Sequence, residues 1–225
     1  MAIRYHTIIE ESFVDGPGGP RVVLVTQGCS IQCPGCQNKE LWPAYGEGSF
    51  MSPMPMAMSL LQRSNRITIT GGEPTDQPQE LWNLMVAIRS FQDSREPAHI
   101  IIYTGRKIED FFMEDIEATG QNFALAALLM ADMVVDGPFI AEQDDDRLQW
   151  RGSRNQRPID IRASITAARA NSHGARHLPR YLVLEDWDTP TLMLTDEGII
   201  GAKGLIEELT DTQEEPSATR RCGQI

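Results

Sequence analysis

Three of the chain's four cysteines lie within eight positions, at Cys29, Cys33 and Cys36. They belong to the segment TQGCSIQCPGCQN (26–38), in which interleaved glycines and a proline favour a tight loop with unusual backbone geometry. Cysteine thiolates bind soft metals, exchange electrons or pair in disulfides. The C-x3-C-x2-C spacing therefore predicts a metal or redox site in a loop.

The residues alone leave four uses of these cysteines open. A structural zinc site needs four protein ligands, whereas the nearest histidine is His6 and Cys222 lies far along the chain; a catalytic zinc with three thiolates remains an option. A redox disulfide between Cys33 and Cys36 leaves Cys29 unused. Three unliganded thiols are the plainest alternative. A [4Fe–4S] cluster with three thiolate ligands and one open iron uses all three cysteines.

The elements that must position this loop are strands alternating with helices. Near-continuous apolar runs, typical of strands covered on both faces, occur at 21–27, 66–72, 99–105 and 132–138. Helical patterns are found at about 54–64, 78–93, 107–118 and 122–131. The second predicted helix has an apolar face made of Leu81, Leu84, Met85, Ile88 and Phe91. This alternation predicts an α/β fold with a parallel sheet, whose carboxyl-end rim carries GCSIQCPGC, TGGEP, YTG and DGP.

The size of the chain predicts one main domain with a small appendage. Its 225 residues are 41% hydrophobic, enough for one core. We place the main domain at 1–163 and a C-terminal extension at 164–225. The small, polar segment 162–180 is predicted to be a linker or surface excursion, YLVLEDW and TLMLT to be short strands, and GLIEEL a helical turn. The polar tail that follows is expected to fray.

Composition also indicates the compartment and the class of partner. The start MAIRYHTIIE lacks the pattern of a secretory signal, and no run approaches the roughly 18 apolar residues of a membrane span, which predicts a cytoplasmic protein without membrane contact. A reducing cytoplasm favours metal or redox roles for clustered cysteines over structural disulfides. The formal net charge of −12 disfavours binding to nucleic acid, and a protein or small-molecule partner is expected.

Several short segments occur in the order found in one known family. The cysteine loop and TGGEP (70–74) resemble the two signatures of radical S-adenosylmethionine (SAM) enzymes. More narrowly, the series VDGPG, GCSIQCPGCQN, TGGEP, YTG, DGPF and WRGSRNQRPID resembles the activating proteins of the anaerobic ribonucleoside-triphosphate reductase, over about the first 160 residues. Gly35 stands where broader radical SAM enzymes often carry an aromatic residue, and the activating proteins share this glycine.

The resemblance implies a fold, two cofactors and a set of site residues. The fold is a partial (βα) barrel of the radical SAM type. Cys29, Cys33 and Cys36 are implied to bind a [4Fe–4S] cluster, with SAM chelating the open iron. The residues implied to contact SAM are Gly35, Cys36 and Gln37 near the nucleoside, Gly71 and Gly72 near the methionine moiety, Glu73 at its ammonium group, and Tyr103 in the pocket wall. For Tyr103, plain packing is the alternative.

The resemblance also implies an activity and a macromolecular partner. An electron from a donor such as flavodoxin or ferredoxin cleaves SAM to methionine and a 5′-deoxyadenosyl radical. The radical then removes a hydrogen from one glycine of a glycyl-radical enzyme, the large subunit of the anaerobic ribonucleotide reductase, whose loop enters the wide barrel mouth. Two alternatives stay open: a radical enzyme acting on another glycyl-radical protein or a peptide, and a non-catalytic iron–sulfur or zinc module.

The remaining polar groups have plainer explanations. Asp136 is predicted to hold a turn, DDD (144–146) to be a solvated loop, and His173 with His177 to be a solvated pair. The arginine and amide side chains of WRGSRNQRP are expected either on a surface loop or facing a carboxylate or the partner's loop. Cys222–Gly223 resembles the radical-glycine loop of the reductase, which suggests an intramolecular decoy, with a free tail as the simpler explanation.

Overall fold

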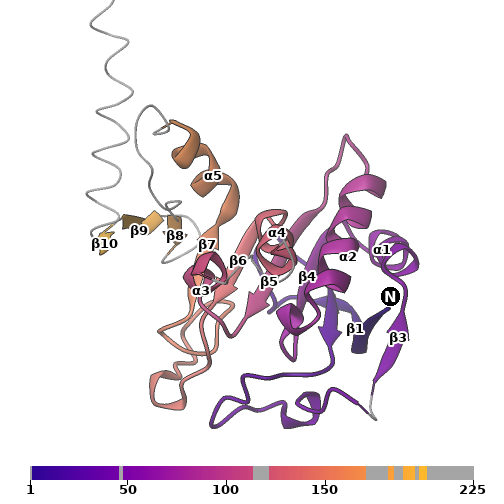
Figure 1. The fold of residues 1–225 in the computed structure, drawn as a ribbon, viewed down its shortest axis with the longest axis horizontal. Coiled ribbons are helices and arrows are strands. Elements are labelled where there is room, and N and C mark those ends of the chain that lie inside the picture. Colours follow the sequence, from indigo (N-terminus) through magenta and orange to yellow (C-terminus); the bar gives the residue numbers. More distant parts are fainter. Residues whose placement is uncertain are drawn as a thin grey trace, which may run out of the picture. The chain divides into compact units, whose positions relative to one another are not determined.

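The computed structural model describes residues 2–45, 48–113, 122–170, 182–184, 190–195 and 198–201. It divides into two compact units, Met1–Ile161 and Arg162–Ile225, and each is considered by itself. The first unit contains the cysteine loop and most of the secondary structure (Figure 1).

The first unit is built on a mixed sheet with the strand order β7-β6-β5-β4-β2-β1-β3. Its strands are β1 (Ile3–Ser12), β2 (Arg21–Thr26), β3 (Ser49–Met51), β4 (Arg66–Gly71), β5 (His99–Thr104), β6 (Met133–Asp136) and β7 (Arg157–Asp160). The central strands β2, β4, β5 and β6 are parallel to one another. β1 and β3 add antiparallel strands beyond β2, and β7 adds one beyond β6.

The four predicted strands are confirmed as the parallel centre of this sheet, and the α/β class is confirmed with them. The three antiparallel strands are absent from the sequence prediction. Most of β1 is partly or fully exposed and carries few continuous apolar residues, while β3 and β7 are short. Strands of this kind lack the buried-run signal on which the prediction rests.

The two faces of the parallel strands differ in chemistry. One face is aliphatic and fully buried, with Val22, Leu24, Ile67, Ile69, Ile100 and Ile102. The other face alternates with it and carries polar side chains, among them Arg21, Thr68, Thr70, His99 and Tyr103. The segment between β1 and β2 lies against the polar face, because the Thr68 hydroxyl donates to the carbonyl of Asp15 at 2.7 Å.

The helices of the first unit are α1 (Pro53–Leu61), α2 (Pro78–Phe91), α3 (Ile108–Met113) and α4 (Phe123–Leu129). α1 and α4 both contact α2 (Figure 1). Proline occupies the start of α1 and α2, where its fixed backbone angle suits the first turn. In α2 the predicted apolar face is buried at Leu81, Leu84, Met85 and Ile88. Phe91 is the exception, because it ends the helix and is 50% exposed. The helix predicted at 107–118 is described only as far as Met113.

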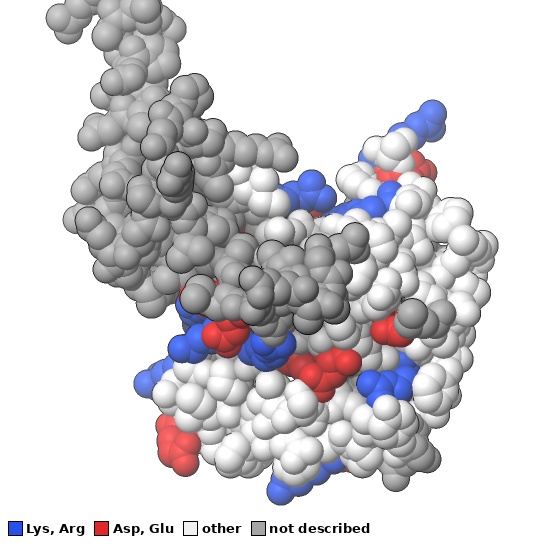
Figure 2. Space-filling model, viewed as in Figure 1, with Lys and Arg blue, Asp and Glu red and all other residues white. Residues whose placement is uncertain are grey.

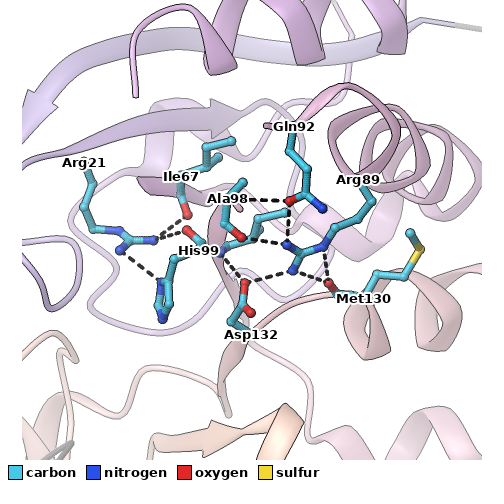
Figure 3. A network of polar contacts seen from close by, with 9 residues as sticks. Arg21, Ile67, Arg89, Gln92, Ala98, His99, Met130 and Asp132 are labelled. Carbon is cyan, nitrogen blue, oxygen red and sulfur yellow. Dashed lines mark hydrogen bonds and ion pairs between the residues drawn. The ribbon is translucent and has the colours of Figure 1, made fainter. Parts of the chain in front are cut away.

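Polar side chains tie the amino ends of the parallel strands together on the rim opposite the cysteines (Figure 3). Arg21 is fully buried; its Nη2 donates to the carbonyls of Ile67 and His99 at 2.7 and 2.9 Å, and its Nη1 lies 3.3 Å from His99 Nδ1. Arg89 on α2 donates to the Asp132 carboxylate at 2.8 Å, and this carboxylate also accepts the backbone N–H of Ile100. Burial lowers the pKa of Arg21 to about 10.

The second unit contains a helix and three short strands. Helix α5 spans Ile161–Ala170, and β8 (Leu182–Leu184), β9 (Pro190–Thr195) and β10 (Gly198–Gly201) form antiparallel pairs. Segment 162–180 is predicted to be a linker or surface excursion, and the structure corrects this for its first part, which forms α5. This part is rich in alanine, the strongest helix former. The predicted strands YLVLEDW and TLMLT are confirmed in β8 and β9. GLIEEL, His173, His177, Cys222 and Gly223 lie outside the described residues.

Two properties of the described surface bear on possible partners. On the face seen in Figure 2, acidic and basic side chains occur in small mixed groups among uncharged residues. Within the described ranges, none of the helices combines the length and the apolar character that crossing a membrane requires.

Candidate functional site

The carboxyl ends of β2, β4, β5 and β6 surround a pocket of about 310 Å3. All but one of the predicted site residues line it: Cys29, Cys33, Cys36, Gln37, Gly71, Gly72, Glu73 and Tyr103. Segments separated by up to about half of the chain therefore meet at one rim, as expected for a parallel sheet.

Gly35 is the predicted residue that the pocket lining does not include. Its φ of +81° favours glycine, and a Cβ atom there would lie 3.0 Å from the Ala141 Cβ and 3.6 Å from the Phe139 ring. The tip of the cysteine loop thus packs against the segment that follows β6. The positive φ and the close approach of Ala141 both favour glycine at this position.

The cysteine loop is anchored at its base by backbone hydrogen bonds. The N–H groups of Gly28 and Cys29 donate to the carbonyls of Leu41 and Trp42 at 2.8 and 3.1 Å. Gln32 has a φ of +50°, a conformation that is uncommon outside glycine and that helps the chain to reverse. The loop therefore has a specific folded shape, in which all three cysteines line one pocket.

The three cysteines are partly exposed free thiols. Burial raises the pKa of the Cys29 thiol; backbone N–H groups of Gln32 and Ile31 oppose this effect, and the nearby Glu73 and Asp76 carboxylates add to it. A cluster ligand must lose this proton when it binds iron.

The double glycine of TGGEP is required by chain packing. A Cβ atom added at Gly71 would lie 2.6 Å from the backbone nitrogen of Thr26, and one at Gly72 only 2.1 Å from the carbonyl oxygen of Gly28. The Gly72 and Glu73 N–H groups donate to the carbonyls of Thr26 and Gly28 at 3.0 and 2.8 Å. The glycines therefore let the turn after β4 bond directly to the base of the cysteine loop, in addition to lining the pocket.

Glu73 is 1% exposed and joins the ends of β4 and β5. Its Oε1 accepts the N–H and hydroxyl of Thr75 and the hydroxyl of Thr104, and its Oε2 accepts the N–H of Gly105 at 2.7 Å. Burial raises the pKa of Glu73, while these donors lower it in part. Because Oε2 accepts a single bond here, it is the oxygen with capacity left for a ligand.

Tyr103 ties the wall of the pocket to the loop before β7. Its hydroxyl donates to the carbonyl of Trp150 at 2.5 Å, and Trp150 itself adopts a positive φ of +53°. Burial raises the pKa of the Tyr103 phenol above its usual value. The phenol therefore stays protonated and acts here as a hydrogen-bond donor to the chain.

The DGP and RGSRNQRP segments form a connected wall. Arg157 donates to Glu109 at 2.7 and 2.6 Å and to the fully buried Asp136 at 2.8 and 2.5 Å, and Asp136 also accepts the N–H of Ile108. Burial alone would lower the pKa of Arg157, but its hydrogen bonds to Asp136 and Glu109 outweigh burial and raise it. The Asp136 carboxylate thus joins Arg157 on β7 to the start of α3, which are segments distant from its own DGP turn, and Arg157 meets a carboxylate of its own chain.

Several lining residues had no assigned role in the sequence prediction. Gln156 Oε1 accepts the N–H groups of Gly152 and Ser153, and its Nε2 donates to the carbonyl of Gly137, which closes the wall next to Phe139. In the sequence, this side of the pocket was indicated only by the presence of DGPF and RGSRNQ in that order along the chain. The DDD segment is a largely exposed loop, as predicted. In addition, Asp144 lines the pocket and Asp145 binds Arg147 and Arg154.

The donor set suits a cluster better than one mononuclear ion. Among the described residues, no three His, Cys, Asp or Glu side chains gather closely enough to hold a single metal. A [4Fe–4S] cluster instead takes its thiolates at separate irons and tolerates an incomplete set. Trp42 lines the pocket, and its buried indole Nε1 has no hydrogen-bond partner. These residues therefore fit a bound group of several polar atoms.

Comparison with known proteins identifies the family to which the chain belongs. A family described as "4Fe-4S single cluster domain" matches residues 14–159. The anaerobic ribonucleoside-triphosphate reductase-activating protein of Enterobacteria phage T4 is 32% identical over 160 residues, which cover 69% of this chain and 92% of the phage protein. The protein of that name from Salmonella typhimurium is 27% identical over 68% of this chain and 96% of its own length. Among solved structures, QueE from Escherichia coli matches with a TM-score of 0.37 and 18% identity over 47% of this chain and 53% of QueE. The chain therefore belongs to the family of anaerobic ribonucleoside-triphosphate reductase-activating proteins.

Proposed function

We propose that the first unit is a radical SAM activase that generates a glycyl radical on an anaerobic ribonucleoside-triphosphate reductase. The observation that carries the proposal is the shared pocket, where three free thiols face the TGGEP turn and the end of β5. The relatives named as activating proteins of this reductase cover the same part of the chain.

In this proposal Cys29, Cys33 and Cys36 would hold a [4Fe–4S] cluster and would leave one of its irons for SAM. When bound and reduced, the cluster supplies the electron that splits SAM into methionine and a 5′-deoxyadenosyl radical. The chain supplies the orientation: the backbone bonds of Gly28 and Cys29 fix the loop from one side, and its tip rests on Ala141.

SAM would lie between the cysteine loop and the ends of β4 and β5. Glu73 Oε2 would accept from its ammonium group, since that oxygen has capacity left, and the backbone at Gly71 and Gly72 would lie beside the methionine moiety. Gln37 would contact the nucleoside, and Tyr103 would form part of the wall.

The polar face of the parallel strands supports a partial barrel. Thr70 and Tyr103 line the pocket, and Thr68 and Arg21 continue the same face towards the amino ends. The first unit's sheet has antiparallel strands at both edges and does not close on itself. A glycine-bearing loop of the reductase's large subunit would enter through the open side, and a cytoplasmic flavodoxin or ferredoxin would deliver the electron.

Anaerobic reconstitution tests the proposal. We expect about four irons and four sulfides per chain, and reductant-dependent cleavage of SAM. A Cys33→Ala variant should lose the site-differentiated cluster and the cleavage, whereas Cys222→Ala, the matched cysteine change elsewhere in the chain, should keep both. Addition of the reductase should then give a glycyl-radical EPR signal. Bound zinc without SAM cleavage, or a cluster retained in Cys33→Ala, would refute the proposal.

A further inference from the structure

The Asp76 carboxylate, which is outside the predicted site, accepts two hydrogen bonds from Ser30, the residue that follows Cys29. The Ser30 N–H donates to Asp76 Oδ2 and the Ser30 hydroxyl to Asp76 Oδ1, both at 2.7 Å. Asp76 ends the 3-10 turn η2 (Pro74–Asp76) directly after TGGEP. Both donors of Ser30 are thus held by one side chain from another strand's turn, through charge-assisted hydrogen bonds.

This contact begins where the other anchors of the cysteine loop end. The backbone bonds to Leu41 and Trp42 reach only as far as Cys29. The next bond to another segment is that of Ser30, and the chain then reverses at Gln32, whose φ is +50°. Asp76 therefore fixes the chain between Cys29, where the backbone anchors end, and Gln32, where the chain reverses.

The direction of this peptide determines what the following N–H groups meet. The N–H groups of Ile31 and Gln32 interact with the Cys29 thiol. The Ser30 N–H donates instead to Asp76. Hydrogen bonds to ligand sulfurs and nearby charge are the main means by which a protein adjusts an iron–sulfur cluster.

We propose that Asp76 is a positioning residue that clamps Ser30 and so holds the Cys29–Gln32 peptides in the shape that receives the cluster. The proposal rests on the function proposed above for its cluster, but the clamp belongs to the chain itself and can be measured without iron. Asp76 is not one of the residues that line the pocket, although its backbone N–H donates to the carbonyl of Glu73, which is.

Hydrogen exchange in the iron-free, full-length protein tests the clamp directly. In Asp76→Ala the Ser30 amide should exchange about tenfold faster or more, because a charge-assisted hydrogen bond is lost. In Asp76→Asn the remaining carbonyl oxygen keeps an acceptor for Ser30, and exchange should be intermediate. Glu80→Gln, four residues further on, removes the same charge from a side chain that makes no hydrogen bond to the described cysteine loop, and it should match the wild type.

The reconstituted protein gives the second readout. Release of iron to a chelator should follow the same order, fastest in Asp76→Ala, slower in Asp76→Asn, and at the wild-type rate in Glu80→Gln. Unchanged Ser30 exchange in Asp76→Ala overturns the proposal, and so does an equal effect of Asp76→Ala and Glu80→Gln, which would assign the effect to charge alone. If the wild type fails to assemble a cluster, the proposed function fails, while the exchange data still decide the clamp.

Discussion

Replacement of Gly72 by alanine should break the connection between the TGGEP turn and the cysteine loop. The added Cβ would lie 2.1 Å from the Gly28 carbonyl oxygen, where contacts below 3.0 Å essentially never occur. That oxygen is backbone and accepts the Glu73 N–H at 2.8 Å, so relief requires the two segments to separate. Gly72 has no positive φ, and the substitution therefore tests space alone.

The cost can be derived from the bonds at risk. Separation threatens the Glu73 bond to Gly28 and the Gly72 bond to Thr26. With about 1–2 kcal/mol for each buried backbone bond lost, we expect a loss of roughly 2–4 kcal/mol in the free energy of unfolding. Gly105→Ala is the matched control, because its Cβ would meet the movable Ile31 side chain at 3.1 Å. It should cost less than about 1 kcal/mol.

Urea unfolding of both iron-free variants, followed by tryptophan fluorescence, measures the difference. The entropy that alanine removes from the unfolded chain is common to the two variants and cancels. Amide exchange at Glu73 localises the effect, since this N–H should lose protection only in Gly72→Ala. If the two variants unfold alike and the Glu73 amide stays protected, the close approach of the two segments is not what requires the glycine.

Three further changes test other contacts of the first unit. Burial lowers the pKa of His99 below its ordinary value of 6.5, and the charge of Arg21 adds to this effect. Protonation of His99 therefore favours the unfolded state. The stability that neutral His99 contributes is complete above about pH 6.5 and is lost as the pH falls below that value. Urea titrations between about pH 7.5 and 5.5 should show a smaller loss in His99→Asn than in the wild type, and equal slopes would count against the assignment. Arg157→Lys keeps the charge but not the paired bonds to Glu109, and we expect a loss of about 2 kcal/mol in urea unfolding; a wild-type midpoint would contradict it. Glu73→Gln places an amide N–H group where the carboxylate now accepts four hydrogen bonds, and it should lower the free energy of unfolding of the cofactor-free protein by about 1–3 kcal/mol. An unfolding curve identical to that of the wild type would contradict the role of Glu73 in joining the ends of β4 and β5.

Sequence patterns located the parts of this fold that are buried on both sides. The runs that became β2, β4, β5 and β6 are rich in β-branched residues and mostly buried, and strands covered on both faces leave that mark in the sequence. β1 shows no such mark, because most of its side chains are partly or fully exposed and its place depends on pairing with β2 and β3. An antiparallel strand of this kind is determined by its neighbours, which a local pattern does not contain.

The same distinction separates the predicted from the missed parts of the site. Cysteine spacing and the double glycine are local, and they lie in the pocket. The clamp between Ser30 and Asp76 joins residues 46 positions apart, and it depends on how two loops reverse. Neither residue type carries a signal for this pairing, since serine and aspartate are common in turns for other reasons.

Glu73 shows why a residue's place in a motif does not by itself define its role. The resemblance assigns it to the ammonium group of SAM, yet the carboxylate already accepts hydrogen bonds from Thr75, Thr104 and Gly105. A variant at this position would therefore lose activity whether or not the carboxylate touches SAM, because the ends of β4 and β5 would lose their connection. The two roles separate only by comparison of the iron-free stability with the affinity for SAM. A loss of affinity beyond that explained by unfolding would belong to the single remaining acceptor site of Oε2.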